Sequence, residues 1–254
     1  MKAGKGIEII ADTYSERYVD LPCNLLCGRH VLEHAANPRA MIGAVRRAVG
    51  KNPRAAVYFE VPNILFTLRQ NGVWDIIYEH VSYFAPQSLY RLFADAGFHV
   101  LEIRESFKGQ YLSLEALVSN DNDGEGYHPV PDDMARLAAD ARAFSAYRKG
   151  LVDRWIAQFD DMRHRGQRVV VWGAGSKGTM FLNALHEHPV VEYLVDINPH
   201  KQGKFVPGTG QQIVPPEALR ELKPDVLILM NPIYRDEVER IVGGLGLAPQ
   251  FLTV

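Results

Sequence analysis

The first half of the chain alternates short apolar runs with patterns of helical spacing. The segments Leu25–Cys27 and Ala55–Val61 are apolar, the second with β-branched and aromatic residues, and they predict two buried strands. Between them, Pro38 marks a helix start, because proline fits the first helical position and apolar residues then recur at helical spacing. Another helix is expected to begin at Pro86 and to end at Gly97. This alternation is typical of an α/β domain with a mostly parallel sheet.

Three more strands are predicted in the same part of the chain. Gly6–Ala11 is expected to form a short strand that ends at Asp12. His99–Ile103 and Tyr111–Val118 follow each other with no helical pattern between them, so they predict an antiparallel hairpin. We expect this hairpin at the end of the sheet.

A long helix and a second α/β unit are predicted after the polar, glycine-rich stretch 120–126, which marks a domain boundary. From Met134 to Met162, apolar residues recur mostly every three or four positions, the spacing of one helix face. Later strands are expected at Arg168–Trp172, Val191–Val195, Asp225–Met230 and Gln250–Val254. We therefore expect a first domain over residues 1–128, a linking helix over 129–166 and a second domain over 167–254.

Composition and charge narrow the function classes. The 254 residues are 47% hydrophobic and 23% charged, which is typical of a soluble globular protein. The sequence shows no membrane span and no signal peptide. The net charge of −2 offers no electrostatic attraction to nucleic acid or anionic lipid. Two cysteines, Cys23 and Cys27, are too few for a disulfide framework or a structural zinc site. We therefore expect a cytoplasmic protein without a bound metal.

A glycine-rich turn in the second unit is the first candidate for chemistry. Gly173, Gly175 and Gly178 follow a predicted strand and open a predicted helix, and Asp196 ends the next strand. This is the context of a dinucleotide-binding unit, in which the glycines approach a phosphate and the acidic residue binds a ribose hydroxyl. Lys177 suits an anionic ligand. The spacing alone fits both a nucleotide site and a purely structural Rossmann-like domain.

Several motifs, taken in chain order, resemble the S-adenosylmethionine-dependent sugar C-methyltransferase family. They are Arg29–His34, Phe59–Pro62, Tyr78–Phe84, Val171–Gly178, Asp196–Gly203 and Pro207–Thr209. Full-length members of that family carry an N-terminal zinc-binding module, a central methyltransferase domain and a C-terminal Rossmann-like domain. The resemblance implies the C-terminal part of such an enzyme, α/β in class: a truncated class I methyltransferase-like sheet, a long helix and a second Rossmann-like parallel α/β domain. The zinc module and the cofactor glycine loop are not recognised in the sequence, so the S-adenosylmethionine site is expected to be incomplete.

The resemblance also implies where the cofactor would bind. Asp12 would follow the third strand of the methyltransferase sheet and meet the adenine amino group. Gly28, Arg29 and His30 would follow the fourth strand and face the methionine end of the cofactor.

A mechanism is implied as well. His80 would be the base that removes a proton beside a keto group on a nucleotide-linked sugar, because an imidazole titrates near neutral pH. The resulting enolate would take the methyl group. Glu79 would orient His80, His34 would line the same pocket, and Tyr78 would stabilise the enolate.

The sequence departs from the family at one position that bears on the identity of the methyl acceptor. The family's Tyr-His-Glu-His run has Ile77 in place of its tyrosine, so Tyr78 or Tyr83 would stand in, and the acceptor stays open. Glu60 and Asn63 are expected to touch the acceptor.

The same resemblance changes the expectation for the glycine turn. It implies that the turn holds the nucleotide-sugar or serves as scaffold, rather than binding a nicotinamide. The residues concerned are Gly173, Gly175, Lys177, Gly178 and Asp196.

Two other functions remain open at this stage, an NAD(P)-dependent sugar-nucleotide oxidoreductase and a non-catalytic nucleotide-sugar binding module. The sequence shows no Tyr-x-x-x-Lys pair that would support hydride transfer. The missing strands are also expected to leave one sheet edge and an apolar face uncovered, and such edges invite association.

Overall fold

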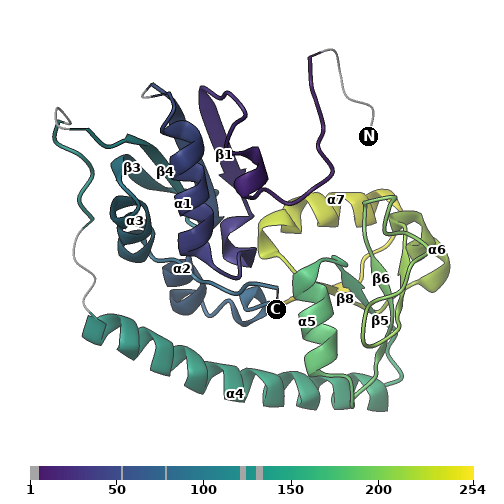
Figure 1. Ribbon diagram of the computed structural model, residues 1–254. Coiled ribbons are helices and arrows are strands. Elements are labelled where there is room, and N and C mark those ends of the chain that lie inside the picture. The colour runs from purple at the N-terminus through teal and green to yellow at the C-terminus, as the bar shows by residue number, and fades with distance from the viewer. Residues whose placement is uncertain (1–5, 53, 78, 121–123, 130–133) are drawn as a thin grey trace. The chain divides into compact units, whose positions relative to one another are not determined.

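The computed structural model describes residues 6–52, 54–77, 79–120, 124–129 and 134–254 of the chain (Figure 1). The chain folds into two compact units. Unit 1 contains residues 1–67 and 78–137, and unit 2 contains residues 68–77 and 138–254. Each unit has its own sheet, of four described strands in unit 1 and five in unit 2.

The sheet of unit 1 has the strand order β1-β2-β4-β3. The strands are β1 (Leu25–Arg29), β2 (Ala56–Pro62), β3 (Phe98–Ser106) and β4 (Tyr111–Val118). β1 and β2 run parallel, whereas β4 is antiparallel to both β2 and β3. The predicted hairpin of β3 and β4 is therefore confirmed, with its second strand paired to β2.

Two helices complete the core of unit 1. They are α1 (Pro38–Val49) and α3 (Pro86–Asp95), both labelled in Figure 1. Both begin at a proline, as predicted. Their apolar faces share one core with β2, β3 and β4, in which the rings of Phe59 and Phe93 meet edge to face at 5.2 Å. The shorter helical elements are η1 (Glu16–Tyr18), η2 (Leu32–His34) and α2 (Ile64–Arg69).

The prediction of a strand at Gly6–Ala11 is wrong, because this segment is exposed and without regular structure. In a doubly wound sheet the third strand pairs only with the second. The described part of unit 1 contains no such partner strand, so the segment lacks the neighbour that would bind its backbone groups. The following residues are held to α1 and its C-terminal end by the ion pairs Glu16–Arg47 and Asp20–Lys51.

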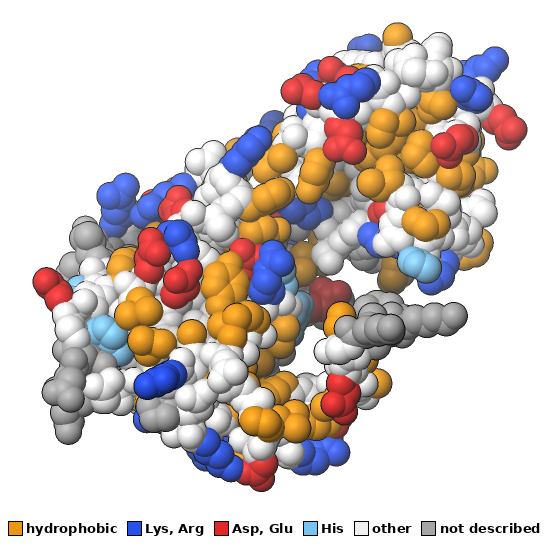
Figure 2. Space-filling model, turned by 90° about the horizontal axis from the view of Figure 1, so that it is seen from above, with side chains coloured by type: hydrophobic (Ala, Val, Ile, Leu, Met, Phe, Trp, Pro, Cys, Tyr) orange, Lys and Arg blue, Asp and Glu red, His pale blue; other side chains and the backbone are white. Residues whose placement is uncertain are grey.

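β1 lies at the edge of its sheet and pairs only with β2 among the described strands. The space-filling view shows hydrophobic side chains on the surface of the molecule (Figure 2). In the N-terminal part of unit 1 the large exposed ones are Ile7, Ile9, Ile10, Leu21 and Leu25. Association through this edge stays a prediction.

Unit 2 is a parallel sheet with the order β7-β6-β5-β8-β9, the arrangement of a Rossmann-like domain. Its strands are β5 (Val169–Trp172), β6 (Val191–Val195), β7 (Gln212–Val214), β8 (Val226–Leu229) and β9 (Gln250–Thr253). Its helices are α4 (Met134–His164), which begins in unit 1, α5 (Ser176–Ala184), α6 (Leu219–Leu222) and α7 (Arg235–Gly244), with the single turns η4 (Pro216–Ala218) and η5 (Pro232–Tyr234). The long helix and the four predicted strands are confirmed.

Residues 68–77, which the sequence places in the first domain, pack with unit 2. They include the turn η3 (Val73–Asp75), whose Trp74 is buried against Phe181 at a ring separation of 5.1 Å. Asp75 forms an ion pair of 2.7 Å with Lys177 on α5. The burial of one large aromatic ring explains why the segment belongs to the second core.

None of the helices in the described part of the chain combines the length and the apolar character needed to cross a membrane.

Candidate functional site

The candidate site lies in unit 1, where β1 and β2 end side by side. Parallel pairing places Arg29 at the end of β1 opposite Glu60 on β2. The next residue, His30, has a φ of 52°, a left-handed conformation that histidine adopts more readily than most residues. Its backbone N–H donates to the Glu60 carbonyl at 3.0 Å. The carboxyl ends of parallel strands are where ligands of open α/β sheets bind, so this turn is well placed for a site.

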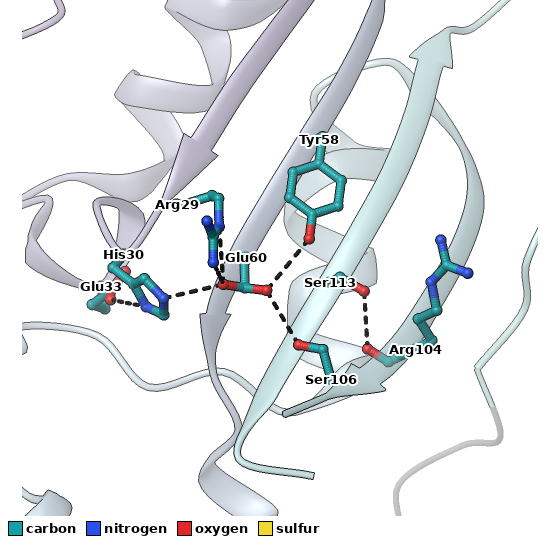
Figure 3. Close-up of polar contacts among 8 residues, drawn as sticks. All are labelled: Arg29, His30, Glu33, Tyr58, Glu60, Arg104, Ser106 and Ser113. Atoms are coloured by element: carbon teal, nitrogen blue, oxygen red, sulfur yellow. Dashed lines mark hydrogen bonds and ion pairs between the residues drawn. The ribbon is translucent and has the colours of Figure 1, made fainter. Parts of the chain in front are cut away.

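Glu60 is the centre of a polar network drawn in Figure 3. Arg29 donates to Oε1 through Nε at 3.1 Å and Nη2 at 2.8 Å, and Nε2 of His30 lies 3.1 Å from the same oxygen. Tyr58 at 3.4 Å and Ser106 at 3.2 Å donate their hydroxyls to Oε2. Both oxygens of this buried carboxylate therefore have partners.

Two opposing effects set the pKa of Glu60. Burial acts to raise the pKa, but the hydrogen bonds and positive charge of Arg29, helped by Ser106 and His30, outweigh it and hold the pKa below its ordinary value. Glu60 is therefore ionised at neutral pH and fixes the orientation of Arg29 and His30.

We expect Glu60→Gln to destabilise the protein at pH 7 by about 1.5–3 kcal/mol, because it removes hydrogen bonds to a charged acceptor. A carboxyl whose folded pKa is lowered stabilises the fold above its unfolded pKa, near 4.5, and loses that contribution as the pH falls through the folded value. The stability difference between the two proteins should therefore shrink below about pH 4.5 in urea denaturation series.

The matched control for this prediction is Glu115→Gln. Glu115 lies in the same sheet but is more exposed, and it pairs with the exposed Arg104. Its loss should cost at most about 1 kcal/mol at any pH. A stability difference for Glu60→Gln that stays constant from pH 7 to pH 3 would contradict the expected titration.

Glu33 links this network to a second group of residues. It lies in η2, is 1% exposed, and its Oε1 is 3.7 Å from Nδ1 of His30. Its Oε2 is buried and has no hydrogen-bond partner among the described residues. Burial raises the pKa of this carboxyl. The Glu33 carbonyl accepts from the backbone N–H of Val81 at 2.8 Å and of Ser82 at 3.1 Å, which holds the segment after His80 against η2.

His34 and His80 meet as a result of that backbone pairing. Their rings are 4.9 Å apart at an angle of 72°. Nδ1 of His34 lies 2.9 Å from the Glu79 carbonyl oxygen. Because a carbonyl only accepts, Nδ1 of His34 carries the proton, and Nε2 of the neutral ring keeps its lone pair. Nδ1 of His80 is buried, and its ring is 6.0 Å from that of Tyr83.

The structure thus brings together three residues that the sequence proposes for one pocket, His34, Glu79 and His80. Glu79 contacts His34 through its backbone, while its own side chain is exposed. Tyr78 lies outside the described residues. Sequence reasoning left Glu33 out of the site, although its position between two histidines of one short motif was a usable signal.

Asp12, proposed to bind the cofactor adenine, is engaged within its own segment. Its carboxylate accepts from the side chains of Arg17 and Tyr18 and from the backbone N–H of Thr13 at 2.8 Å. It lines a cavity of about 280 Å³ together with apolar residues of the N-terminal segment, β1 and α1. Its predicted contact with a cofactor stays a prediction.

Gly28 is required by the core. A Cβ atom on this residue would lie 2.4 Å from the ring of Phe59, which is fully buried. The close approach of β1 to that ring accounts for the glycine without any ligand. Its backbone, like those of Arg29 and His30, still lies at the sheet edge where a ligand would bind.

Gly28→Ala should therefore destabilise the protein by about 1–3 kcal/mol, the usual cost of overpacking a core. The control is Gly243→Ala in α7, where an added Cβ meets nothing within 4 Å and should stabilise the helix by about 0.5–1 kcal/mol. Urea denaturation of both variants measures the difference. Equal stabilities would show that Phe59 moves aside at little cost.

Asn63, proposed to touch the acceptor, is buried and serves the local structure. Its side-chain nitrogen donates to the Gly109 carbonyl at 3.1 Å, and its side-chain oxygen accepts from the Leu65 backbone at 3.1 Å. Asn63 therefore joins the start of α2 to the turn between β3 and β4.

In unit 2, backbone geometry and packing account for two glycines of the glycine-rich turn. Gly173 has a φ of 112°, and a Cβ on Gly178 would lie 2.2 Å from the Gly173 carbonyl oxygen. Asp196 accepts from Ala174 N at 3.1 Å and Lys201 Nζ at 3.1 Å, so its carboxylate binds its own loops.

The other two residues proposed in this turn lie at the start of α5. Gly175 is the N-cap of α5, and Lys177 in its first turn forms the ion pair with Asp75. The predicted role of the turn in holding a nucleotide-sugar stays a prediction.

Comparison with known proteins follows the same division of the chain. Residues 5–103 match a family described as a methyltransferase domain. Residues 135–243 match a family described as the C-methyltransferase C-terminal domain. A curated relative, the C-methyltransferase NovU of Streptomyces niveus, is 26% identical over 228 residues, which cover 84% of this chain and 52% of the relative. The chain therefore spans about half the length of that relative.

Two solved structures overlap parts of the chain. One is the riboflavin-derivative dimethyltransferase RosA of Streptomyces davawensis, 22% identical, with a TM-score of 0.33 over 40% of this chain and 32% of RosA. The other is TnmH, 16% identical, with a TM-score of 0.30 over 39% of this chain and 32% of TnmH. Both TM-scores are too low to define the fold.

The methyltransferase-domain match precedes the C-methyltransferase C-terminal match along the chain, and the curated relative matches across most of the chain. Over most of its length the chain is therefore similar to C-methyltransferases.

Proposed function

We propose that this chain is the part of a C-methyltransferase that activates the methyl acceptor, with His80 as the base. The acceptor is a nucleotide-linked sugar, and the methylated carbon lies next to its keto group. The observation that carries this proposal is the pair His34 and His80, with rings 4.9 Å apart beside the carboxyl ends of β1 and β2.

The chemistry begins with one proton transfer. The neutral imidazole of His80 takes the proton from the carbon beside the keto group, the C–H bond breaks, and its electron pair forms the enolate. The resulting imidazolium is stabilised by the Glu33 carboxylate, which has an oxygen within 4.8 Å of a ring nitrogen of His80. Tyr83, whose ring is 6.0 Å from His80, is our proposed donor to the enolate oxygen.

His34 positions this base. Its Nδ1–H is tied to the Glu79 carbonyl, so the ring cannot turn freely and presents a fixed edge to His80. Arg29 and His30, held by Glu60, border the same sheet edge, and we propose that they face the methyl donor.

S-adenosylmethionine, the methyl donor expected for this family, would supply an electrophilic methyl group to the enolate carbon. The described residues of unit 1 fit one side of a site for it, around Gly28, Arg29 and His30. No glycine-rich turn follows a strand of this sheet in the part that the structure describes. We therefore assign the donor to that edge of the sheet.

Proton exchange tests the proposal without the methyl donor. The full chain is incubated in D2O, with a chelator, with a thymidine-diphosphate keto-deoxysugar, and deuterium at the carbon beside the keto group is followed by proton NMR. Enzyme-dependent exchange at that carbon supports the base assignment. A folded protein that catalyses no exchange on any keto-sugar nucleotide overturns it.

A parallel titration addresses the oxidoreductase alternative. The Asp196 carboxylate, which would have to bind the adenosine ribose of NAD(H), is already bonded to Ala174 and Lys201. We therefore expect no saturable change in NADH fluorescence. Saturation together with hydride transfer to the keto-sugar would replace the proposed function.

A further inference from the structure

We propose that Glu33, His34 and His80 form a binding site for a divalent cation of the zinc class. Each residue offers one donor atom, and the three atoms lie within 4.8 Å of one another. From the sequence no metal is expected, because two cysteines are too few for a structural zinc site. Here two ligands are neighbours in one turn and the third comes from a segment 46 residues later.

The donor set suits zinc. Two imidazoles and one carboxylate are the protein ligands of one class of zinc site, which leaves the fourth position open. Zinc bonds of about 2.0–2.2 Å in a tetrahedron place neighbouring donors about 3.4 Å apart. The present separations of up to 4.8 Å need only small side-chain rotations to reach that value.

The His34 ring is already oriented as a ligand. A metal-bound histidine almost always donates its other ring N–H to a carbonyl or carboxylate, which fixes the tautomer. Nδ1 of His34 makes this contact with the Glu79 carbonyl at 2.9 Å. The lone pair of Nε2 is therefore available for a cation.

Glu33 supplies the independent observation. Its side chain is 1% exposed, and its Oε2 has no hydrogen-bond partner among the described residues. A buried carboxylate oxygen without a partner carries a desolvation cost that a bound cation would remove. The other oxygen lies 3.7 Å from Nδ1 of His30, whose Nε2 is itself 3.1 Å from Glu60.

A bound cation would also affect the proposed reaction. It would coordinate the lone pair of His80, and a base whose lone pair is coordinated cannot accept a proton. This effect on the reaction rests on the proposed function. Zinc should therefore inhibit the exchange reaction, and chelator should restore it. Binding itself is measured separately, so a failure of the proposed function leaves the metal site testable.

The experiment uses the full chain without an affinity tag, stripped with chelator. Zn²⁺ binding is measured by isothermal titration, and Co²⁺ is used to record the visible spectrum. We expect one ion per chain, with no comparable heat from Mg²⁺. His34→Gln, His80→Gln and Glu33→Gln should each weaken Zn²⁺ binding at least about tenfold, since even residues that only support a ligand cost 10–100-fold.

The matched control is the His186→Gln, Glu187→Gln double variant, which removes a histidine and a glutamate from an exposed neighbouring pair in unit 2. It should bind Zn²⁺ like the original protein. Because Glu33 is buried and its variant can misfold, the more exposed His34 carries the decision, with folding checked by thermal melting. Absent binding, unchanged binding in folded His34→Gln, or a Co²⁺ spectrum with thiolate charge-transfer bands from Cys23 or Cys27 would overturn the site.

Discussion

Replacing His80 by alanine is expected to slow deuterium exchange beside the keto group by about 10²–10⁴-fold, the usual contribution of a positioned general base. The expectation follows from placement: His80 is half-buried, next to His34 and within 4.8 Å of the Glu33 carboxylate. Exchange rates are measured by NMR in chelator, so that metal binding does not interfere. The thermal melting point should change little by comparison.

Three comparisons make this result specific. His186→Ala removes an exposed histidine of unit 2 and should leave the rate unchanged. His34→Ala should lower the rate less than His80→Ala does, because His34 positions the base and does not take the proton. Added imidazole should restore part of the rate in His80→Ala. A folded His80→Ala protein with the original rate would show that another group is the base.

Much of the fold follows from local sequence. The strands β2 and β5 have runs of β-branched and aromatic residues, and α1 and α3 begin at prolines. These signals act within a few residues, so they are visible without the rest of the structure. The antiparallel hairpin is likewise a local feature.

The strand predicted at Gly6–Ala11 shows where local signals fail. Its isoleucines have the right spacing, but a strand exists only when a neighbour binds its backbone groups. Strand propensity in a sequence does not record whether that neighbour is present. The exposure of Ile7, Ile9 and Ile10 is the physical result.

The site was predictable only in part for a similar reason. His34, Glu79 and His80 belong to short motifs, and the family resemblance drew attention to them. The surroundings of Glu60 depend on strand register, since Ser106 reaches it from 46 residues away and Arg29 from 31. The unpartnered oxygen of Glu33 depends on burial, which no motif encodes.

The segment 68–77 has no periodic pattern that assigns it to either core, yet its Trp74 completes an aromatic cluster of unit 2. The ring of Phe181 lies 5.1 Å from Trp74, 5.0 Å from Trp155 and 5.8 Å from Phe159, each nearly perpendicular. Phe181 therefore holds together three parts of the chain that are far apart in sequence.

Phe181→Ala is accordingly expected to destabilise the protein by about 3–5 kcal/mol, the cost of removing a fully buried phenylalanine. The loss includes the apolar area of the ring, the cavity left behind and three edge-to-face contacts. Urea denaturation measures the change. Tryptophan fluorescence should report it directly, because two of the chain's 3 tryptophans surround this ring.

The control is Phe205→Ala, which removes the same side chain from a 63% exposed position of unit 2 and should change the stability by less than about 0.5 kcal/mol. Trp74→Phe separates the role of the segment 68–77 from that of the Phe181 ring. It keeps an aromatic side chain at position 74 but makes that side chain smaller. If the segment is anchored as the structure shows, amide hydrogen exchange across residues 68–77 should rise in Phe181→Ala and stay unchanged in Phe205→Ala. Equal exchange in both variants would mean that the segment is held by other contacts, and the stability loss would then belong to the sheet core alone.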